Sequence, residues 1–312
     1  MKIFNNFDIP KNIKGSILLI GNFDGVHLGH KKLFKEAQKY KKKYKLKIGV
    51  LTFEPMPKMF FNKKLKNFRI SSLKQKNELM KNLKIDFLIN KKFDKKFSST
   101  NSINFIKKII SKKLKTQFIF VSDNFRFGKN REGDVKQLKS FESELNYQLI
   151  KPKPVKLNNK IVSSTLIRKS LENGRLDFAN KLLDRKWVVD GKVEKGRQLG
   201  RKIGFPTCNI DIKDFLIPRL GVYAVNVFLK GKIYKGIANI GYRPTFNQKK
   251  LLLEVHLFNF SGNLYNKYLR VNFLKFIRKE KKFKNVDQLR KQIKTDLLIA
   301  KKENEQISNK ST

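Results

Sequence analysis

The sequence has a single cysteine, Cys208, and therefore cannot form an internal disulfide. Histidine is also scarce, with three residues in 312. The apolar run near the N-terminus, residues 16–20, is too short for a signal-peptide core or a membrane span. These absences argue against a disulfide scaffold and against a membrane protein. We therefore expect a protein of the reducing cytoplasm, with no membrane partner.

Acidic residues are few as well: 25 Asp and Glu stand against 72 Lys and Arg, which gives a net charge of +47. The lysines are dispersed, as in residues 40–47, and do not form a basic tail. One interpretation is a surface that binds RNA or DNA. The other is a lysine-rich composition on solvated surfaces, which we favour, so we expect no nucleic-acid partner. The positive field would still attract anionic ligands.

The length of the chain suggests two domains. In the first half, apolar strand-like runs alternate with segments that have helical spacing, which is typical of an α/β fold with a parallel sheet. The predicted strands are residues 47–53, 85–90 and 117–122, and the predicted helices are residues 73–83 and 103–114. Two short helices are expected to follow, one opening at Ser164 and one near Arg175.

The pattern changes at about residue 184. Short β-rich segments are punctuated by glycine, with hairpin-like turns at Lys230-Gly231 and Ser261-Gly262. This pattern predicts an antiparallel barrel or sandwich, closed by a C-terminal helix over residues 286–301. We therefore expect one domain over residues 1–183 and another over residues 184–312.

The stretch GNFDGVHLGH, residues 21–30, follows the apolar run 16–20. A strand, a glycine-rich turn and a helix in this order place the turn where α/β folds bind ligands, with helix N–H groups aimed at an anion. His27 and His30 are three residues apart, so both can face one phosphate, whose charge grows during reaction. Half of a zinc site and a pair of capping histidines are the alternatives.

Two further segments suit nucleotide binding. The aromatic and basic loop 123–134 could stack on a ring and hold phosphate, although a pair of core-facing Phe side chains is the alternative. Ser163, Ser164 and Thr165 are of the N-cap type, and Arg168 adds a permanent charge within the first turn of the helix. Helix capping alone would also explain the Ser and Thr residues.

The second half contains no P-loop motif, so phosphoryl transfer there would use another arrangement. Residues 191–210 instead form a basic, glycine-rich segment able to wrap phosphates, with Gly196, Gly200 and Gly204. Thr207 and Asn209 offer oxygen ligands of the kind that Mg²⁺ accepts. An ordinary glycine-rich loop between two strands remains the alternative.

These motifs resemble those of one family. Residues 27–30 resemble the HxGH motif of nucleotidyltransferases, and residues 21–30 as a whole resemble the opening of bacterial bifunctional riboflavin kinase/FAD synthetases. Residues 123–134, 161–168, 191–210, 239–246, 253–265 and 277–283 are similar to further segments of that family, in the same order and over nearly the full chain.

The resemblance implies an N-terminal Rossmann-like nucleotidyltransferase domain and a C-terminal antiparallel β-barrel kinase domain. The kinase would phosphorylate riboflavin to FMN, and the first domain would join FMN to ATP, giving FAD and pyrophosphate, with Mg²⁺ as the metal ion. The site residues that it implies for adenylyl transfer are His27, His30, Asn124 and Arg168 as catalytic residues, with Gly21, Phe23, Asp24, Gly25, Arg126, Arg131, Ser163, Ser164 and Thr165 as ligand-binding residues. Those that it implies for the kinase are Glu254 as catalytic base, Gly196, Gly200, Gly204, Pro206 and Arg278 as ligand-binding residues, and Thr207 and Asn209 as metal ligands.

Glu254 also stands out in the sequence itself. It interrupts an apolar strand, where an ionised side chain is costly without a purpose. Strand alternation puts it on one face with Leu252 and His256. We interpret His256 as structural. A buried, partnered carboxylate is the alternative for Glu254, which matches the family's catalytic base.

The chain departs from the family pattern at several positions. Met56 replaces a histidine, and we hypothesise that Met56 lines the flavin pocket and modestly weakens adenylyl transfer. Cys208 replaces an alanine, a small-for-small change. Asn259, Asn263 and Asn266 stand at the usual Asp, Asp and Gly positions, which could reduce the kinase rate. The sequence does not indicate an oligomeric state, and a tRNA-charging enzyme is disfavoured because no KMSKS segment is present.

Overall fold

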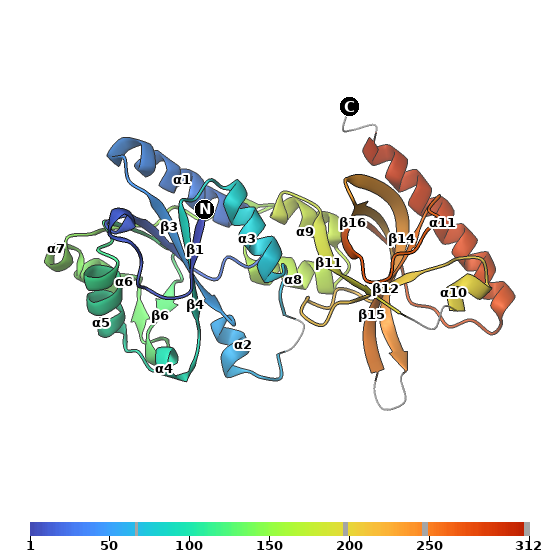
Figure 1. Ribbon diagram of the computed structural model, residues 1–312, viewed down its shortest axis with the longest axis horizontal. Helices are drawn as coiled ribbons and strands as arrows, with labels where there is room; N and C mark the ends of the chain where they lie inside the picture. Colours follow the sequence, from blue (N-terminus) through green and yellow to red (C-terminus); the bar gives the residue numbers. More distant parts are fainter. Residues whose placement is uncertain (66–67, 196–198, 245–248, 309–312) are drawn as a thin grey trace. The chain divides into compact units, whose positions relative to one another are not determined.

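A computed structural model describes residues 1–65, 68–195, 199–244 and 249–308 of the chain (Figure 1). They form two compact units. The first unit comprises Met1–Lys66 and Leu73–Ser163, and the second comprises Asn67–Ser72 and Ser164–Thr312. The predicted domain boundary at residue 184 stays a prediction.

The first unit is built on a six-stranded, wholly parallel sheet with the order β1-β4-β3-β2-β5-β8 (Figure 1). The strands are β1 (Lys2–Phe4), β2 (Ile17–Ile20), β3 (Ile48–Glu54), β4 (Phe87–Lys92), β5 (Phe118–Phe120) and β8 (Gln148–Ile150). The predicted parallel sheet and its three predicted strands, now β3, β4 and β5, are confirmed.

Both faces of this sheet are buried, which explains why its strands are continuous apolar runs. In β2, Ile17 and Leu19 pack into one hydrophobic core, while Leu18 and Ile20 pack into another. Phe34 of the first long helix belongs to the first of these cores, and Ile106 belongs to the second. Helices cover each face accordingly.

The helical segments of the first unit lie between the strands. They are η1 (Lys11–Ile13), α1 (Leu28–Tyr44), α2 (Pro57–Phe61), α3 (Leu73–Asn82), α4 (Lys95–Ser98), α5 (Ser102–Asn104), η2 (Phe105–Lys113), η3 (Lys129–Arg131), α6 (Val135–Ser140) and α7 (Glu142–Leu145). The two predicted helices are confirmed as α3 and as α5 continued by η2, which is π-helical. Two small ribbons pair β6 (Arg126–Phe127) with β7 (Gly133–Asp134), and β9 (Lys156–Leu157) with β10 (Lys160–Ile161).

The strand order gives this sheet a topological switch point. Strand β2 lies between β3 and β5, so the chain leaves β2 toward one side of the sheet and later returns to its other side at β5. Open α/β sheets bind ligands at such a switch point, beyond the carboxyl ends of the strands. The loops that follow β2 and β5 meet at this edge because the two strands are parallel and hydrogen-bonded.

The second unit begins with two helices, α8 (Ser164–Glu172) and α9 (Leu176–Leu183), which confirms the two short helices predicted there. A closed barrel follows, with the strand order β11-β12-β15-β14-β13-β16. Its strands are β11 (Trp187–Glu194), β12 (Cys208–Asp211), β13 (Gly221–Leu229), β14 (Lys232–Pro244), β15 (Lys249–Leu257) and β16 (Tyr268–Lys279), and α10 (Leu199–Lys202) lies between β11 and β12. The predicted antiparallel barrel is confirmed.

The two predicted hairpin turns have different outcomes. Lys230 and Gly231 connect the paired strands β13 and β14, with φ angles of 47° and 79°. The hairpin predicted at Ser261-Gly262 is wrong, because β15 pairs with β12 and β14 and not with β16. These two residues lie instead in a long connection between strands that are not neighbours in the barrel.

The C-terminal helix, α11 (Val286–Ser308), packs against the outside of the barrel (Figure 1). Its Ala300 is fully buried in a cluster with Val222, Ala224 and Leu274 of the strands. The predicted helix over residues 286–301 is therefore confirmed and is longer than predicted. Among the residues that the structure describes, no helix has the length and apolar character that crossing a membrane requires.

Candidate active sites

The loop after β2 has a constrained backbone. Phe23, Gly25 and Val26 all have positive φ angles, of 49°, 81° and 37°. Such angles are costly for Phe and Val and persist where the surroundings over-determine the backbone, often at functional sites. Gly21 N–H donates to the Leu51 carbonyl at 3.1 Å, which joins the loop to the end of β3. The Phe23 side chain and Asp24 are buried.

His27 and His30 lie together at the start of α1. Their rings are stacked, with centroids 3.7 Å apart, and the Phe23 ring meets His30 edge-on at 5.1 Å. His27 is the N-cap, and its Nδ1 accepts a hydrogen bond from the His30 N–H at 3.4 Å. A neutral His27 therefore carries its proton on Nε2. Capping and phosphate binding are compatible here, since the cap uses only one ring nitrogen.

The zinc alternative gains no support from this geometry. Within the described part of the chain, no group of three or more His, Cys, Asp or Glu side chains could hold a metal ion. The N-terminus of α1 lies at the switch point of the sheet, and the positive end of a helix dipole favours anions there.

Gly29 permits a close approach of two segments of the first unit. A Cβ atom at this position would lie 3.2 Å from the His27 ring and 3.2 Å from the Val162 carbonyl oxygen. The strand-like segment before Ser163 therefore passes directly beside the first turn of α1. Any side chain at position 29 would press on the His27 ring and on the Val162 carbonyl group.

Of the next predicted nucleotide-binding residues, Ser163 is the last residue of the first unit, whereas Ser164, Thr165 and Arg168 lie in the second unit. Ser164 and Thr165 form the first turn of α8. Arg168 donates from Nε to the Phe68 carbonyl at 3.0 Å, and its guanidinium lies 3.8 Å from the centre of the Phe68 ring. Their predicted contact with the triphosphate stays a prediction.

The loop after β5 has the core-facing Phe side chains of the alternative interpretation, and its predicted contact with a ring and phosphate stays a prediction. Phe127 is buried and packs against Phe105, with ring centroids 5.4 Å apart. Asn124, Arg126 and Arg131 are exposed. The aromatic residue anchors the loop in the core, while the polar side chains project from the edge of the sheet that carries the histidine loop.

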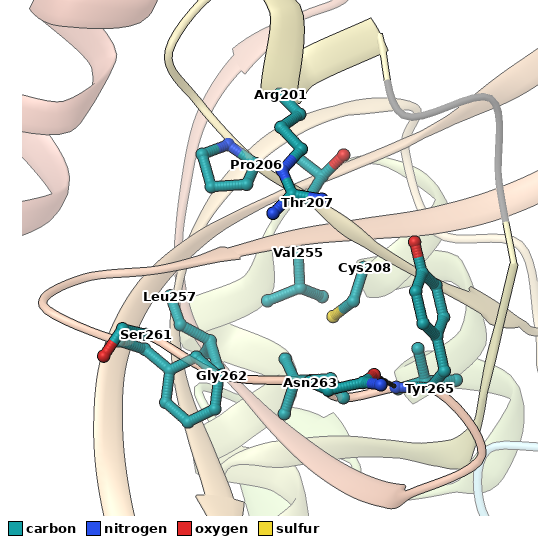
Figure 2. A pocket seen from close by; sticks show the side chains of 13 residues that line it. Arg201, Pro206, Thr207, Cys208, Val255, Leu257, Ser261, Gly262, Asn263 and Tyr265 are labelled. Carbon is teal, nitrogen blue, oxygen red and sulfur yellow. Dashed lines mark hydrogen bonds between the residues drawn. The ribbon is translucent and has the colours of Figure 1, made fainter.

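In the described part of the barrel unit, two cavities lie beside predicted kinase residues. The first measures about 560 Å³ and lies between the barrel wall and α11. Most of its lining is apolar, and its polar residues include Asn239, Glu254 and Glu280. The second measures about 580 Å³ and is more polar, with Arg201, Ser261, Asn263 and Tyr265 around its rim (Figure 2). Thr207 lines both cavities.

Glu254 is buried in the wall of the first cavity. Its neighbours Leu253 and Val255 are fully buried on the opposite face of β15, whereas Glu254 and His256 share the face toward this cavity, as their spacing predicts. Asn209 on β12 and Asn239 on β14 lie directly opposite Glu254 in the barrel register. The carboxylate is thus flanked by two amide side chains.

The segment that carries Thr207 and Asn209 is held in place by His256. The His256 Nδ1 lies 2.8 Å from the Pro206 carbonyl oxygen and must donate to it, since a carbonyl only accepts. Asn209 Oδ1 is buried and has no hydrogen-bond partner among the described residues. A buried oxygen of this kind needs a partner, which an ordered water or a bound ion can supply.

The glycines of the preceding segment shape a tight turn. A Cβ atom on Gly200 would lie 2.4 Å from the Phe205 carbonyl oxygen, and Gly204 has a φ angle of 89°. Gly200 lines the first cavity and Pro206 the second. Gly196 lies outside the described residues.

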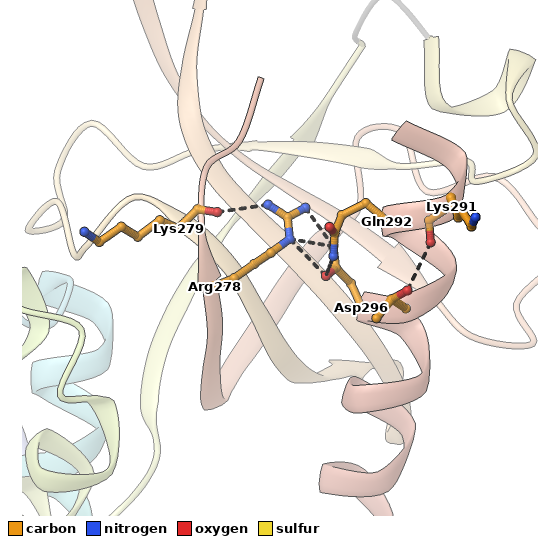
Figure 3. A network of polar contacts seen from close by, with 6 residues as sticks. Arg278, Lys279, Lys291, Gln292 and Asp296 are labelled. Carbon is orange, nitrogen blue, oxygen red and sulfur yellow. Dashed lines mark hydrogen bonds and ion pairs between the residues drawn. The ribbon is translucent and has the colours of Figure 1, made fainter. Parts of the chain in front are cut away.

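Arg278 lines the first cavity, and its guanidinium is engaged with α11 (Figure 3). Its Nε lies 2.9 and 3.0 Å from the two carboxylate oxygens of Asp296, and Nη2 lies 2.7 Å from one of them. Nη1 donates to the Lys279 carbonyl at 2.9 Å. The predicted contact with flavin or phosphate stays a prediction. Sequence reasoning missed Asp296, although an acid at helical spacing between Ile293 and Ala300 could have signalled it.

The positions that depart from the family pattern are accommodated without disruption. Asn266, at the usual glycine position, adopts a φ angle of 64°, which Asn tolerates better than most residues. Asn263 Oδ1 accepts from the Tyr265 N–H at 2.9 Å. Cys208 is buried beside the second cavity, and burial raises the pKa of its thiol to about 12. Met56 is buried at the N-cap of α2.

Comparisons with known proteins agree with this two-part organisation. Residues 9–166 match the family described as FAD synthetase, and residues 183–303 match riboflavin kinase. A bifunctional riboflavin kinase/FMN adenylyltransferase of Buchnera aphidicola is 39% identical over 97% of this chain and 98% of its own. The protein of that name from Escherichia coli K12 is 36% identical over 92% of each chain.

A solved structure matches the whole chain as well. A crystal structure described as a macrolide-efflux protein from Streptococcus pneumoniae has a TM-score of 0.84 and 28% identity, and the match covers 96% of this chain and 98% of that one. With two matched domains in order and curated relatives over nearly its full length, the chain belongs to the family of bifunctional riboflavin kinase/FMN adenylyltransferases.

Proposed function

We propose that the protein makes FAD in two steps, phosphorylating riboflavin in its barrel unit and adenylylating the resulting FMN in its parallel-sheet unit. The observation that carries this proposal is the pair of cavities that share Thr207, one mostly apolar with Glu254 in its wall and one more polar with Arg201 at its rim. Such a pair suits a flat aromatic alcohol and a polyphosphate that meet at Thr207.

In the kinase step, the apolar cavity would hold the flavin ring, and Glu254 would take the proton of the terminal ribityl hydroxyl. That oxygen then attacks the γ-phosphorus of ATP, the bond to the bridging oxygen breaks, and ADP leaves. Glu254 suits this role because it is buried in the cavity wall and offers a carboxylate beside the alcohol. His256 and the glycine turn would position the segment that meets the phosphates.

Mg²⁺ fits the oxygen atoms of the segment that carries Thr207 and Asn209. Asn209 supplies a buried carbonyl oxygen without a hydrogen-bond partner in the described structure, and Thr207 supplies a hydroxyl at the shared wall. Both are hard oxygen ligands. When bound with ATP, the ion would neutralise charge on the phosphates.

In the adenylyl-transfer step, the N-terminus of α1 with His27 and His30 would bind the ATP phosphates. The loop after β5 would hold FMN and nucleotide phosphates with Asn124, Arg126 and Arg131. We also assign ATP binding to Ser163, Ser164, Thr165 and Arg168, as the family resemblance implies. An oxygen of the FMN phosphate attacks the α-phosphorus of ATP, and pyrophosphate leaves. No covalent intermediate is needed, because positioning and charge stabilisation supply the catalysis.

The domain division and the setting of the protein belong to the same proposal. We assign adenylyl transfer to residues 1–183 and the kinase to residues 184–312, and we expect the protein to act in the cytoplasm on riboflavin, FMN and ATP without a nucleic-acid partner. The net charge of +47 is consistent with attraction of FMN and ATP, which are anionic.

The direct test is to incubate the protein with riboflavin, ATP and MgCl₂ and to separate FMN and FAD by chromatography. A second reaction with FMN in place of riboflavin isolates adenylyl transfer, and EDTA in each reaction tests the metal requirement. FAD from both reactions, lost with EDTA, supports the proposal. Salt-sensitive RNA or DNA binding with no flavin product would instead favour a nucleic-acid-binding protein.

A further inference from the structure

A lysine is buried in the core of the first unit, where charged side chains rarely lie. Lys76 on α3 is 4% exposed, in a chain whose other lysines mostly lie at the surface. Burying an ammonium group is expensive unless hydrogen bonds and charges compensate for the lost water. The buried position of Lys76 therefore points to a role that a surface lysine does not have.

The ammonium group of Lys76 reaches the carboxyl end of β3. Its Nζ lies 3.2 Å from Oγ1 of Thr52, which is fully buried. Since an ammonium group only donates, Lys76 donates and the Thr52 hydroxyl accepts. The Thr52 hydroxyl is thereby left with its own proton to donate elsewhere.

Thr52 donates that proton to the loop after β2. Its Oγ1 lies 3.3 Å from the carbonyl oxygen of Asn22. Asn22 stands between Gly21 and Phe23, at the start of the loop with positive φ angles that leads to His27. A relay of two hydrogen bonds therefore runs from α3, through β3, to the loop that we assign to ATP.

From this geometry we infer that Lys76 is a positioning residue for adenylyl transfer, holding the loop after β2 through Thr52. The inference rests on the adenylyl transfer proposed above. Phe23 and Val26 have positive φ angles, which their side chains disfavour. The two hydrogen bonds of the relay help to hold the loop in this conformation. The ammonium group of Lys76 also adds a positive charge near the edge of the sheet where phosphates would bind. Loss of Lys76 should therefore slow the chemical step.

The test compares paired variants in the full-length protein, with FMN and ATP as substrates. Lys76→Met keeps the length of the side chain and removes its charge and its hydrogen bonds. Thr52→Val keeps the shape and removes the hydroxyl, while Thr52→Ser restores it. Lys81→Met is the matched control, because Lys81 lies on the same helix and is exposed.

We expect Lys76→Met and Thr52→Val each to lower kcat of FMN adenylylation by about 10²-fold, the loss typical of a small misplacement of reacting groups. KM for FMN should change little, and Thr52→Ser and Lys81→Met should stay near wild type. The double variant should be no worse than the poorer single variant, since both changes interrupt one relay. Riboflavin phosphorylation by the other unit should persist, because both changes lie in the first unit.

Three results would overturn the inference. The first is adenylylation near the wild-type rate in Lys76→Met or in Thr52→Val. The second is a multiplicative loss in the double variant, which would mean that the two residues act separately. The third is a fall in folded protein that accounts for the whole loss and that Thr52→Ser does not reverse. Failure of the proposed function itself looks different, because the wild-type protein would then form no FAD from FMN.

Discussion

Asn209 and Glu254 lie directly opposite each other on the antiparallel strands β12 and β15. The first residue offers a buried carbonyl oxygen, and the second offers a buried carboxylate in the wall of the apolar cavity, which Thr207 also lines. The proposed metal ligand and the proposed base are therefore held by one strand pair and keep their separation without help from a loop. The rigid barrel thereby fixes the relative position of the phosphate-binding and proton-accepting groups.

Glu254→Gln should abolish most of the kinase activity while keeping the shape of the side chain. We expect riboflavin phosphorylation to fall by about 10²–10⁴-fold, because no other group replaces the lost base. Adenylylation of supplied FMN should be little changed. Initial rates of FMN and FAD formation measure both effects, with the exposed Asp214→Asn as control. A Glu254→Gln variant with a wild-type phosphorylation rate would show that Glu254 is not the base.

Replacement of Asn209 should change the metal dependence of the kinase. Asn209→Leu removes the buried oxygen, so we expect the MgCl₂ concentration for half-maximal phosphorylation to rise by about tenfold or more, equivalent to roughly 1.4 kcal/mol. Asn209→Asp retains an oxygen ligand and should need less MgCl₂ than Asn209→Leu. A titration of MgCl₂ at fixed ATP measures this half-maximal concentration. If it is unchanged in Asn209→Leu, Asn209 is not a metal ligand.

His30→Ala should lower adenylylation and leave the kinase activity intact, the reverse of Glu254→Gln. The ring lies at the first turn of α1, so its loss removes one charge-stabilising donor and should lower FMN adenylylation by about 10²–10³-fold. FMN should then accumulate when riboflavin is the substrate. Lys35→Ala, an exposed change on the same helix, is the control. Equal loss of both activities would indicate misfolding and not a local role.

Parts of the fold were predictable from the sequence where only one kind of structure explains the pattern of residues. Strands buried on both faces must be apolar throughout, so β3, β4 and β5 could be located before their structure was seen. The position of Glu254 was predictable for the converse reason, since a lone acid in an apolar strand is conspicuous. Both features depend on the local sequence alone.

Other features depend on partners that are distant in the chain. The turn at Ser261-Gly262 resembles a hairpin locally, but strand order in the closed barrel separates β15 from β16. Lys76 cannot be distinguished by sequence from the many surface lysines, because only tertiary packing buries it. The partner of Arg278 could not be predicted either, since the ion pair with Asp296 requires the docking of α11.

Cys208 should be an unreactive thiol in the folded protein. Burial raises its pKa to about 12, so at pH 8 only about one molecule in 10⁴ carries the reactive thiolate. We expect iodoacetamide to alkylate it about 10³-fold more slowly than free cysteine at this pH, with a rate that rises roughly tenfold per pH unit below pH 12. Mass spectrometry follows the reaction. Alkylation in urea should approach the rate of free cysteine, and a native rate equal to it would contradict the burial.

The ion pair between Arg278 and Asp296 should hold α11 against the barrel. The Asp296 side chain is 3% exposed and that of Arg278 is 22% exposed, so Asp296→Asn would leave a largely buried guanidinium without its countercharge. We expect the free energy of unfolding of this unit to fall by about 3 kcal/mol, the lower end of the range for broken buried pairs, because Arg278 keeps some contact with water. Trp187, the only tryptophan of the chain, is buried in the barrel and reports the urea transition of this unit by fluorescence.

The same change should weaken riboflavin binding, because Leu289 and Ile293 of α11 line the apolar cavity. KM for riboflavin should therefore rise in Asp296→Asn, whereas adenylylation of FMN by the other unit should not change. Asp287→Asn, on the exposed side of the same helix, should cost less than about 1 kcal/mol, since it alters only a charge near the helix N-terminus. If Asp296→Asn and Asp287→Asn unfold at the same urea concentration, the ion pair does not anchor α11, and packing of Ala300 and Leu297 against the barrel must hold the helix alone.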